Sequence, residues 1–355
     1  MRTRLDGLRE QFDRLRIDAF LVTFQPHFQY LTGFSGSSGL GLVTKHSAYF
    51  ITDGRYAEQV RNQAKGWHIF ITPESLFGEL QKLKLLRPGW RIGIDGNTIV
   101  LSQYKQLKKL FPAVRFLPKV DVVEQLAAVK DAGEIKNIAK AVAITDRVFS
   151  DILGVVKPGV AELDIAAEIS YLHRKYGAEG DGFEPIVVSG ERSSLPHGKP
   201  STKKIRLGDL VTLDFGCVVE GYHSDLTRTI AIGNLSPERT RIYNIVLAAQ
   251  LKSIEAARDG MKSHELDAVA RNYIKSQGFE KFFRHSLGHG IGLQIHESPR
   301  ISAQSKSVLS AGNAVTIEPG IYVPKLGGVR IEDDVIITRG GCKVLSRSPK
   351  ELIVL

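Results

Sequence analysis

The stretch that decides the fold is Val211-Thr-Leu-Asp-Phe-Gly216, followed closely by Gly221-Tyr-His-Ser-Asp-Leu-Thr-Arg-Thr229. The first stretch is apolar apart from one aspartate, and the second continues into another apolar run. Between them, Val219-Glu220-Gly221 has the composition of a tight turn. The pattern predicts a β-hairpin with one acidic residue on each strand.

The two acidic residues are Asp214 and Asp225. A two-residue loop at Val219-Glu220 would place them directly opposite each other, and a loop at Glu220-Gly221 would offset them by two residues. In both registers they face the same side of the sheet, because side chains alternate along a strand. Neighbouring carboxylates among apolar residues repel each other and lose hydration. A divalent metal ion between them is therefore expected.

The composition is that of a soluble globular protein with two domains. The chain has 355 residues, of which 43% are hydrophobic and 24% are charged. No apolar run approaches the roughly 20 residues of a membrane span, and the first residues contain no apolar segment typical of a secretory signal. Two cysteines, Cys217 and Cys342, cannot form a disulfide framework, so a reducing cytoplasm is the expected location.

The net charge of +10 lies almost entirely in the first third of the chain. Residues 1–120 contain 18 Lys and Arg against 9 Asp and Glu, a net charge of +9. The basic residues are scattered and have no aromatic residues interleaved with them. We therefore expect a solvated basic surface and no nucleic-acid binding.

Residues 1–122 are predicted to form an α/β domain with a mixed sheet, because strand and helix patterns alternate along them. An amphipathic helix is expected over Leu5–Leu15 and another helix over Leu101–Leu110. Apolar runs predict strands at Ala19–Thr23, Leu40–Thr44, Ser47–Thr52 and Arg91–Asp95. No glycine-rich phosphate loop or nucleophile elbow occurs in these residues, so they indicate no chemistry of their own.

Residues 123–355 are predicted to form the second domain, which contains the candidate chemistry. A long charged helix is expected over 122–150, with a break near Asp131. Further helices are expected at 162–176, 239–258 and 263–277, and strands and turns from residue 278 onward.

Six of the ten histidines fall between residues 197 and 296. Most histidines are ordinary core or surface residues, and we interpret His173, His223, His264 and those before residue 70 in this way. His289 differs because it stands between glycines in Leu287-Gly-His-Gly-Ile-Gly292. Glycine lets the backbone approach a neighbour closely, which would fix the imidazole in place.

Two glutamates complete the pattern, each within a strand-like apolar run. They are Glu318 in Val315-Thr-Ile-Glu-Pro-Gly and Glu332 in Gly328-Val-Arg-Ile-Glu-Asp. A glutamate among Val and Ile is costly to bury unless it is paired. Taken singly, Glu318 could begin a turn and Glu332 could pair with Arg330. Together with the aspartates and His289, they indicate one site.

This ordered series of Asp214, Asp225, His289, Glu318 and Glu332 resembles that of the pita-bread metallopeptidases, in the proline-specific branch of Xaa-Pro aminopeptidases and Xaa-Pro dipeptidases. The resemblance covers essentially the whole chain. Phe50-Ile-Thr-Asp-Gly-Arg-Tyr56 resembles the creatinase/prolidase N-terminal domain, and Val129–Ile138 resembles the first helix of the catalytic domain. The resemblance implies an α/β N-terminal domain and an α+β pita-bread catalytic domain.

The resemblance also implies a site with two divalent metal ions, most favourably manganese, with cobalt or zinc as alternatives. Asp214 would bind one ion, His289 and Glu318 the other, and Asp225 and Glu332 both. Glu318, His197 and His296 would be the catalytic residues. The substrate would be bound by His197, His285, His296, Arg300 and Arg330, with Arg300 as a partner for the free carboxylate of a dipeptide.

Three functions compatible with these residues remain open. The first is hydrolysis of the Xaa-Pro bond of longer peptides or of dipeptides, by a homodimer that binds neither nucleic acid nor membranes. The second is a methionine aminopeptidase-like activity, although those enzymes usually lack an N-terminal domain. The third is a non-catalytic pita-bread protein that binds peptides, although such relatives have usually lost metal ligands, and all five are present here.

Overall fold

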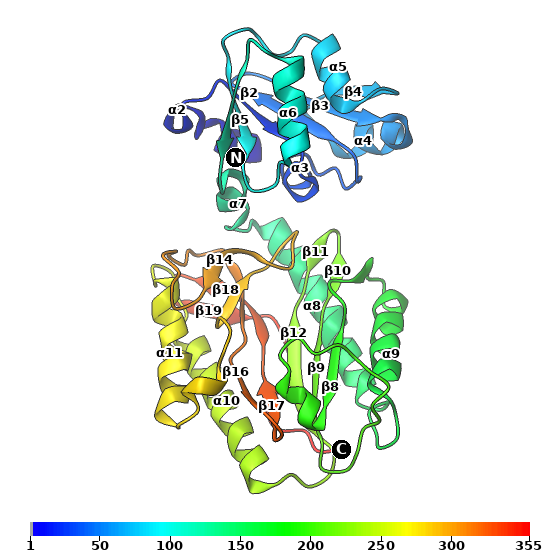
Figure 1. Cartoon of the computed structure of the whole chain (residues 1–355), viewed down its shortest axis with the longest axis vertical. Helices are drawn as coiled ribbons and strands as arrows, with labels where there is room; N and C mark the ends of the chain where they lie inside the picture. Colours follow the sequence, from blue (N-terminus) through cyan, green and yellow to red (C-terminus); the bar gives the residue numbers. More distant parts are fainter. Residues whose placement is uncertain (1–2) are drawn as a thin grey trace. The chain divides into compact units, whose positions relative to one another are not determined.

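The computed structural model describes residues 3–355, which divide into two compact units, Met1–Ala127 and Ala128–Leu355. Figure 1 shows the elements of both units. We call Met1–Ala127 the N-terminal unit and Ala128–Leu355 the C-terminal unit. Within the described residues, no helix combines the length and the hydropathy needed to cross a membrane.

The N-terminal unit contains one six-stranded mixed sheet with the order β4-β3-β2-β1-β5-β6. Strand β2 is antiparallel to both β1 and β3, and the pairs β3–β4, β1–β5 and β5–β6 are parallel. The strands are β1 (Ala19–Val22), β2 (Leu40–Thr44), β3 (Ala48–Asp53), β4 (His68–Thr72), β5 (Arg91–Asp95) and β6 (Arg115–Lys119). The α/β class and mixed sheet are those expected from the alternating patterns.

Helices cover this sheet, and apolar side chains of α5 and α6 pack on it to form the core of the unit. The helices are α1 (Arg4–Arg9), α2 (Phe12–Leu15), α3 (Gln25–Thr32), α4 (Ala57–Gln63), α5 (Leu76–Lys82), α6 (Leu101–Leu110) and α7 (Val122–Ala127). The single helix predicted over Leu5–Leu15 is wrong in one respect. The structure divides it into α1 and α2, and the N–H of Glu10 turns back to the carbonyls of Asp6 and Leu8.

In the C-terminal unit, strands lie between two pairs of helices, as Figure 1 shows. The helices are α8 (Ala132–Ile152), α9 (Glu162–Lys175), α10 (Pro237–Ala256) and α11 (Ser263–Ser276). One core joins α8 and α9 to the sheet β12-β9-β8. Another joins α10 and α11 to the sheet β14-β13-β15-β18-β19. Each buried Leu, Ile or Val in these cores stabilises the unit by about 1.5–3 kcal/mol.

The strands of the C-terminal unit are antiparallel to their neighbours. They are β7 (Gly180–Asp181), β8 (Ile186–Ser189), β9 (Leu210–Phe215), β10 (Cys217–Val219), β11 (Tyr222–His223), β12 (Leu226–Ala231), β13 (Gly288–Gly290), β14 (Glu297–Ile301), β15 (Ala314–Ile317), β16 (Gly320–Val323), β17 (Gly327–Arg330), β18 (Asp333–Thr338) and β19 (Gly341–Val344).

The hairpin predicted from residue 211 onward is present, and its register selects one of the two alternatives. Val219 pairs with Tyr222, which leaves Glu220-Gly221 as the two-residue loop. Asp214 pairs with Thr227, so Asp225 is offset from it by two residues. Gly216 permits this close pairing, since a Cβ atom there would lie 1.7 Å from the carbonyl oxygen of Ser224.

The break predicted near Asp131 is also present, between α7 and α8. The Asp131 carboxylate accepts a hydrogen bond from the N–H of Glu134, and the Glu134 carboxylate accepts one from the N–H of Asp131. This capping box satisfies otherwise unpaired N–H groups of the first helical turn and fixes where α8 begins.

Candidate active site

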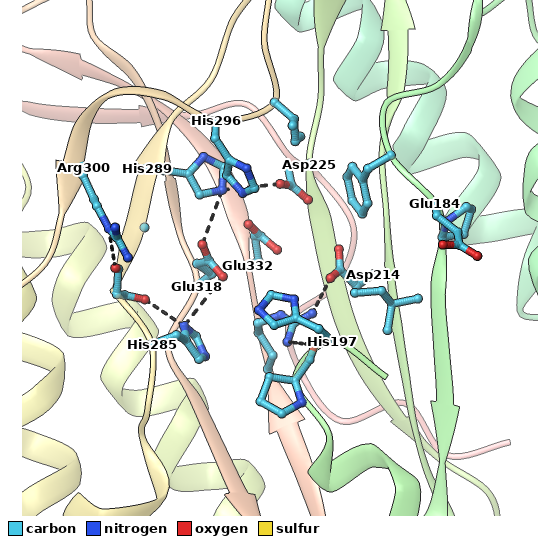
Figure 2. Close-up of a pocket in the computed structure, with 18 of the residues that line it drawn as sticks. Glu184, His197, Asp214, Asp225, His285, His289, His296, Arg300, Glu318 and Glu332 are labelled. Carbon is cyan, nitrogen blue, oxygen red and sulfur yellow. Dashed lines mark hydrogen bonds and ion pairs between the residues drawn. The ribbon is translucent and has the colours of Figure 1, made fainter. Parts of the chain in front are cut away.

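The five side chains singled out in the sequence converge in the C-terminal unit from two sheets and the loops beside them. Asp214 lies on β9, and Asp225 directly precedes β12. His289 lies on β13, Glu318 directly follows β15, and Glu332 lies between β17 and β18. Figure 2 shows the five side chains around one space.

His289 presents one ring nitrogen to this space. Its Nε2 atom lies 3.5 Å from Glu318 Oε1 and 3.7 Å from Asp225 Oδ2. Its Nδ1 atom lies 3.0 Å from the carbonyl oxygen of Gly290 and donates to it when protonated. Nε2 then carries the lone pair, which is the arrangement of a metal-binding histidine.

The glycines on either side of His289 are sterically required. A Cβ atom at Gly288 would lie 2.0 Å from the carbonyl oxygen of Thr316, and one at Gly290 would lie 2.3 Å from that of Ser298. The backbone of β13 therefore packs against both neighbouring strands without room for a side chain. His289 is held by this close contact, as the flanking glycines indicated.

The carboxylates of the cluster are buried and incompletely hydrogen-bonded. Asp225 and Glu332 are 6% and 2% exposed. Asp225 Oδ1, Glu332 Oε1 and Asp334 Oδ1 are buried without a hydrogen-bond partner among the described residues. One ligand atom from each of Asp225, His289 and Glu332 lies within 4.8 Å of the other two. Buried anionic oxygens so close together need a cation.

Burial and the crowding of carboxylates also shift the pKa values of the cluster. Burial, followed by the charges of neighbouring carboxylates, raises the pKa of Asp225 and of Glu332 well above the usual range. Burial raises the pKa of Glu318 to about 8. Burial also lowers the pKa of His289 to about 4, so its imidazole is neutral at pH 7. This set, rich in carboxylate oxygens with one neutral imidazole, fits divalent cations.

Arg330 compensates part of the negative charge from the other side. Its guanidinium contacts the Asp214 carboxylate and donates to the hydroxyl of Tyr322 at 2.7 Å and to Thr227 Oγ1 at 3.0 Å. The Thr227 hydroxyl donates in turn to Glu332. The pairing of Arg330 with Glu332, considered from the sequence, is replaced by direct contact with Asp214.

The remaining sequence-predicted residues surround a cavity of about 760 Å³. His197, His285, His296 and Arg300 all line it, together with the cluster itself. The ring centroids of His289 and His296 are 4.3 Å apart. Burial, followed by the charge of His197, lowers the pKa of His296. The imidazole of His296 therefore lies beside that of His289 in the same cavity as the crowded carboxylates.

His285 and Arg300 occupy one wall of this cavity. His285 Nε2 lies 2.9 Å from the hydroxyl of Tyr322, and burial lowers the pKa of His285 to about 3. The exposed Arg300 side chain donates from Nε to Ser286 Oγ at 3.0 Å (Figure 2). Its two terminal nitrogens take no part in this hydrogen bond. Tyr322 and Thr227 were not predicted from the sequence, since neither has a distinctive local pattern.

Comparison with known proteins defines the class. Residues 136–339 match metallopeptidase family M24, and residues 4–129 match the creatinase/prolidase N-terminal domain. The chain belongs to metallopeptidase family M24. The family and the fold expected from the sequence are thereby confirmed.

Individual relatives are similar over nearly the full length. The chain is 43% identical to a solved Xaa-Pro dipeptidase from Bacillus anthracis, with a TM-score of 0.95 and 99% of each chain covered. It is 38% identical to the prolidase from Pyrococcus horikoshii OT3, with a TM-score of 0.93 and 99% of each chain covered. An X-Pro aminopeptidase from Thermotoga maritima MSB8 is 37% identical, with a TM-score of 0.89 and 97% and 100% covered.

Proposed function

We propose that this protein hydrolyses the peptide bond between an N-terminal residue and a following proline, using two divalent metal ions. One observation carries the proposal: unpartnered carboxylate oxygens and a neutral imidazole converge beside a cavity large enough for a short peptide. Full-length similarity to Xaa-Pro dipeptidases and to an X-Pro aminopeptidase supports this substrate class.

In this proposal Asp214 would help to hold one metal ion, His289 and Glu318 would help to hold the other, and Asp225 and Glu332 would contribute to both. When bound, such ions lower the pKa of water and polarise a carbonyl group. The donor set favours Mn²⁺, and Co²⁺ or Zn²⁺ are alternatives, because hard carboxylate oxygens outnumber the single nitrogen. Arg330 keeps Asp214 oriented through their direct contact.

Glu318 is the proposed proton carrier. Its carboxylate stands at the edge of the cluster and the cavity, where it can take a proton from the attacking water. The attack forms the new C–O bond. When the tetrahedral intermediate collapses, Glu318 gives that proton to the proline nitrogen and the C–N bond breaks. The products are the N-terminal residue with a free carboxylate and a proline with a free amine.

His197 and His296 are the proposed stabilisers of the tetrahedral oxyanion. Both line the cavity, and His296 lies against His289. A neutral imidazole can donate one N–H to an oxygen that becomes negative in the transition state. His285, held by Tyr322, would line the pocket that receives the proline ring.

Arg300 is the proposed determinant of substrate length. A dipeptide carries its free carboxylate on the proline, and a guanidinium binds a carboxylate through charge-assisted hydrogen bonds. Arg300→Ala should raise the KM for Gly-Pro about ten- to a hundredfold and leave Xaa-Pro-Yaa peptides little changed. Equal effects on both substrates would return Arg300 to a structural role and favour the aminopeptidase activity.

The deciding experiment compares three substrates on enzyme loaded with Mn²⁺: Gly-Pro, an Xaa-Pro-Yaa tripeptide and Met-Ala-Ser. Turnover of either proline substrate at the Xaa-Pro bond supports the proposal, and their ratio assigns the dipeptidase or aminopeptidase activity. Faster turnover of Met-Ala-Ser would establish the methionine aminopeptidase alternative. Absence of all three activities in metal-loaded protein would favour a peptide-binding function. A homodimer in the cytoplasm remains a prediction, which sedimentation and cell fractionation would test.

A further inference from the structure

A buried ion pair lies beside the cavity and outside the metal cluster, and one of its two residues, Glu297, lines the cavity. Lys130 Nζ is 2.7 Å from Glu297 Oε2, and the two side chains are only 1% and 8% exposed. Lys130 lies just before α8, and its N–H donates to the carbonyl oxygen of Gly312 at 2.9 Å. Lys130 and Glu297 are 167 positions apart in sequence, so they meet only in the folded chain.

Glu297 is the residue directly after His296, and its carboxylate holds the loop that presents that histidine. Glu297 Oε1 accepts a hydrogen bond from the N–H of Gln294 at 3.0 Å. The N–H of Gly292 donates to the carbonyl oxygen of Gln294 at 3.1 Å. A Cβ atom at Gly292 would lie 2.6 Å from Glu297 Oε2. The loop is therefore folded tightly around the carboxylate.

The imidazole of His296 depends on this loop for its position. Within residues 3–355 we find no hydrogen bond from another residue to the His296 ring, which contacts the ring of His289 at 4.3 Å between centroids. The loop is also fixed on its other side, where the N–H of His223 donates to the carbonyl oxygen of Gly292 at 2.8 Å. The backbone geometry of residues 292–297 thus determines where the imidazole stands.

We infer that Lys130 is a positioning residue for His296 and acts through Glu297. The inference rests on the role proposed above for His296. A carboxylate inside so tight a loop is stable as an anion only if a cation neutralises it, and Lys130 supplies that charge. Without the ammonium group, the Glu297 carboxylate turns toward water, and the loop loses its central acceptor. A shift of about 1 Å in a catalytic group can lower the rate about a hundredfold.

The first test replaces Lys130 and follows kcat and KM with Gly-Pro, bound metal, and the melting temperature. Lys130→Met should lower kcat about thirty- to a hundredfold, change KM less than about threefold, and leave bound metal unchanged. Lys130→Arg should recover most of kcat, because it restores the cation. Lys203→Met is the matched control, since Lys203 also forms a 2.7 Å pair, with Asp209, and does not line the cavity. It should lower only the melting temperature.

The second test uses Glu297→Gln, which keeps an oxygen for the N–H of Gln294 but removes the charge. In this variant the Lys130 ammonium is left unpaired, so kcat should fall. In the double variant Lys130→Met/Glu297→Gln neither charge remains, and kcat should exceed that of Lys130→Met by about tenfold. If Lys130→Met does not fold, Glu297→Gln and the double variant carry the test, and an unchanged kcat in both would overturn the inference.

The inference and the proposed function fail in different ways. If His296→Ala lowers kcat but Lys130→Met does not, Lys130 has only a structural role and the proposed function stands. If His296→Ala leaves kcat unchanged, the proposed role of His296 is wrong, and with it the positioning role of Lys130. If Lys130→Met and Lys203→Met have the same effect on kcat and melting temperature, the effect of Lys130 is one of general stability.

Discussion

Each unit of this protein contains a cluster of one histidine and two carboxylates, and the two clusters differ in geometry. In the N-terminal unit, His27 on α3 meets Asp95 at the end of β5 and Glu124 on α7. In the C-terminal unit, His289 meets Asp225 and Glu332. The residue types are the same, so composition alone does not separate them.

Geometry separates the two clusters. His27 uses opposite ring nitrogens: Nδ1 lies 2.6 Å from Asp95 Oδ2, and Nε2 lies 3.8 Å from Glu124 Oε1. The first distance is that of an ion pair. His289 uses Nε2 alone, at 3.5 and 3.7 Å from two carboxylates, and its Nδ1 is committed to Gly290. At His289 one ring nitrogen faces two carboxylates at wider spacing, which leaves room for a cation, whereas the two ring nitrogens of His27 each face one carboxylate.

The pKa shifts of the two clusters run in opposite directions. Burial raises the pKa of Asp95, but the hydrogen bond and charge of His27 outweigh this effect and leave the pKa below its usual value. In the C-terminal unit, burial and neighbouring carboxylates raise the pKa of Asp225 and Glu332. The Asp225 and Glu332 carboxylates lie among other carboxylates, whereas the Asp95 carboxylate has the His27 ring beside it. A paired set of variants can test this distinction.

The largest effect is expected from removing Asp225, the carboxylate proposed to bind both ions. Asp225→Ala should abolish binding of the two ions and lower kcat/KM by at least about a thousandfold, because the ions supply several kcal/mol of transition-state stabilisation. Bound metal is measured by inductively coupled plasma mass spectrometry and activity with Gly-Pro. Asp95→Asn, the corresponding change in the N-terminal cluster, should leave both measurements unchanged. Loss of one metal equivalent in Asp95→Asn would contradict the comparison.

The second largest effect is expected at His296, whose ring lies beside that of His289. The N-terminal cluster of His27, Asp95 and Glu124 contains no second histidine. His296→Ala should lower kcat about a hundred- to a thousandfold, as loss of one oxyanion donor does, while KM and bound metal stay nearly constant. Steady-state kinetics with metal-loaded protein measure the split between kcat and KM. A rise in KM alone would reassign His296 to ground-state binding of the peptide.

A smaller effect is expected in the N-terminal cluster itself. His27→Gln removes the group between the buried Asp95 carboxylate and the half-buried Glu124 carboxylate and should destabilise the N-terminal unit by about 1–3 kcal/mol. Urea unfolding measures the loss, and kcat per metal-loaded protein should not change. His46→Gln, at an exposed histidine of the same unit, is the matched control and should have no effect. A loss of bound metal in His27→Gln would show that the N-terminal cluster is also a metal site.

The smallest effect is a difference in how stability depends on pH. The pKa of Glu318 is raised from 4.5 to about 8, so the folded metal-free protein binds more protons than the unfolded chain between these values. Its free energy of unfolding should therefore fall as pH rises from about 5 to 8, lowering the melting temperature by several degrees. Bound Mn²⁺ should remove this decline, because cations replace the protons.

The N-terminal cluster should show the opposite sign. The pKa of Asp95 is lowered from 3.8, so its contribution to stability is present above pH 3.8 and is lost as the pH falls through the lower folded value. Thermal unfolding from pH 3 to 8, with and without chelator, separates the two contributions. Identical pH profiles for metal-free and metal-loaded protein would contradict the uncompensated charge of the C-terminal cluster.

The aspartates and the histidine of the C-terminal site could be predicted from the sequence because each has a local signature, whereas Glu318 and Glu332 were indicated only in combination with them. Asp214 and Asp225 lie on a hairpin whose alternation fixes their common face, and His289 lies between glycines that the close strand packing requires. The break before α8 was predictable for the same reason, since Asp131 and Glu134 form a capping box over four adjacent residues.

Other contacts could not be predicted, because they join residues far apart in the chain. His27 was interpreted as an ordinary histidine, since nothing near it in sequence indicates Asp95 or Glu124. The contact between Arg330 and Asp214 spans 116 positions, and that between Lys130 and Glu297 spans 167. Such contacts depend on side-chain packing in three dimensions. The sequence does not show which of two candidate residues will pair with a given charged side chain.

The hairpin around Gly216 sets a limit for any redesign of this enzyme. The carbonyl oxygen of Ser224 fills the volume that a side chain at position 216 would need, so the spacing between Asp214 and Asp225 is dictated by backbone contact. Replacing Asp214 or Asp225 by a residue with a longer side chain would not change the backbone spacing between the two positions. The backbone at Gly216 and Ser224 therefore limits which ion radius the proposed site could accept.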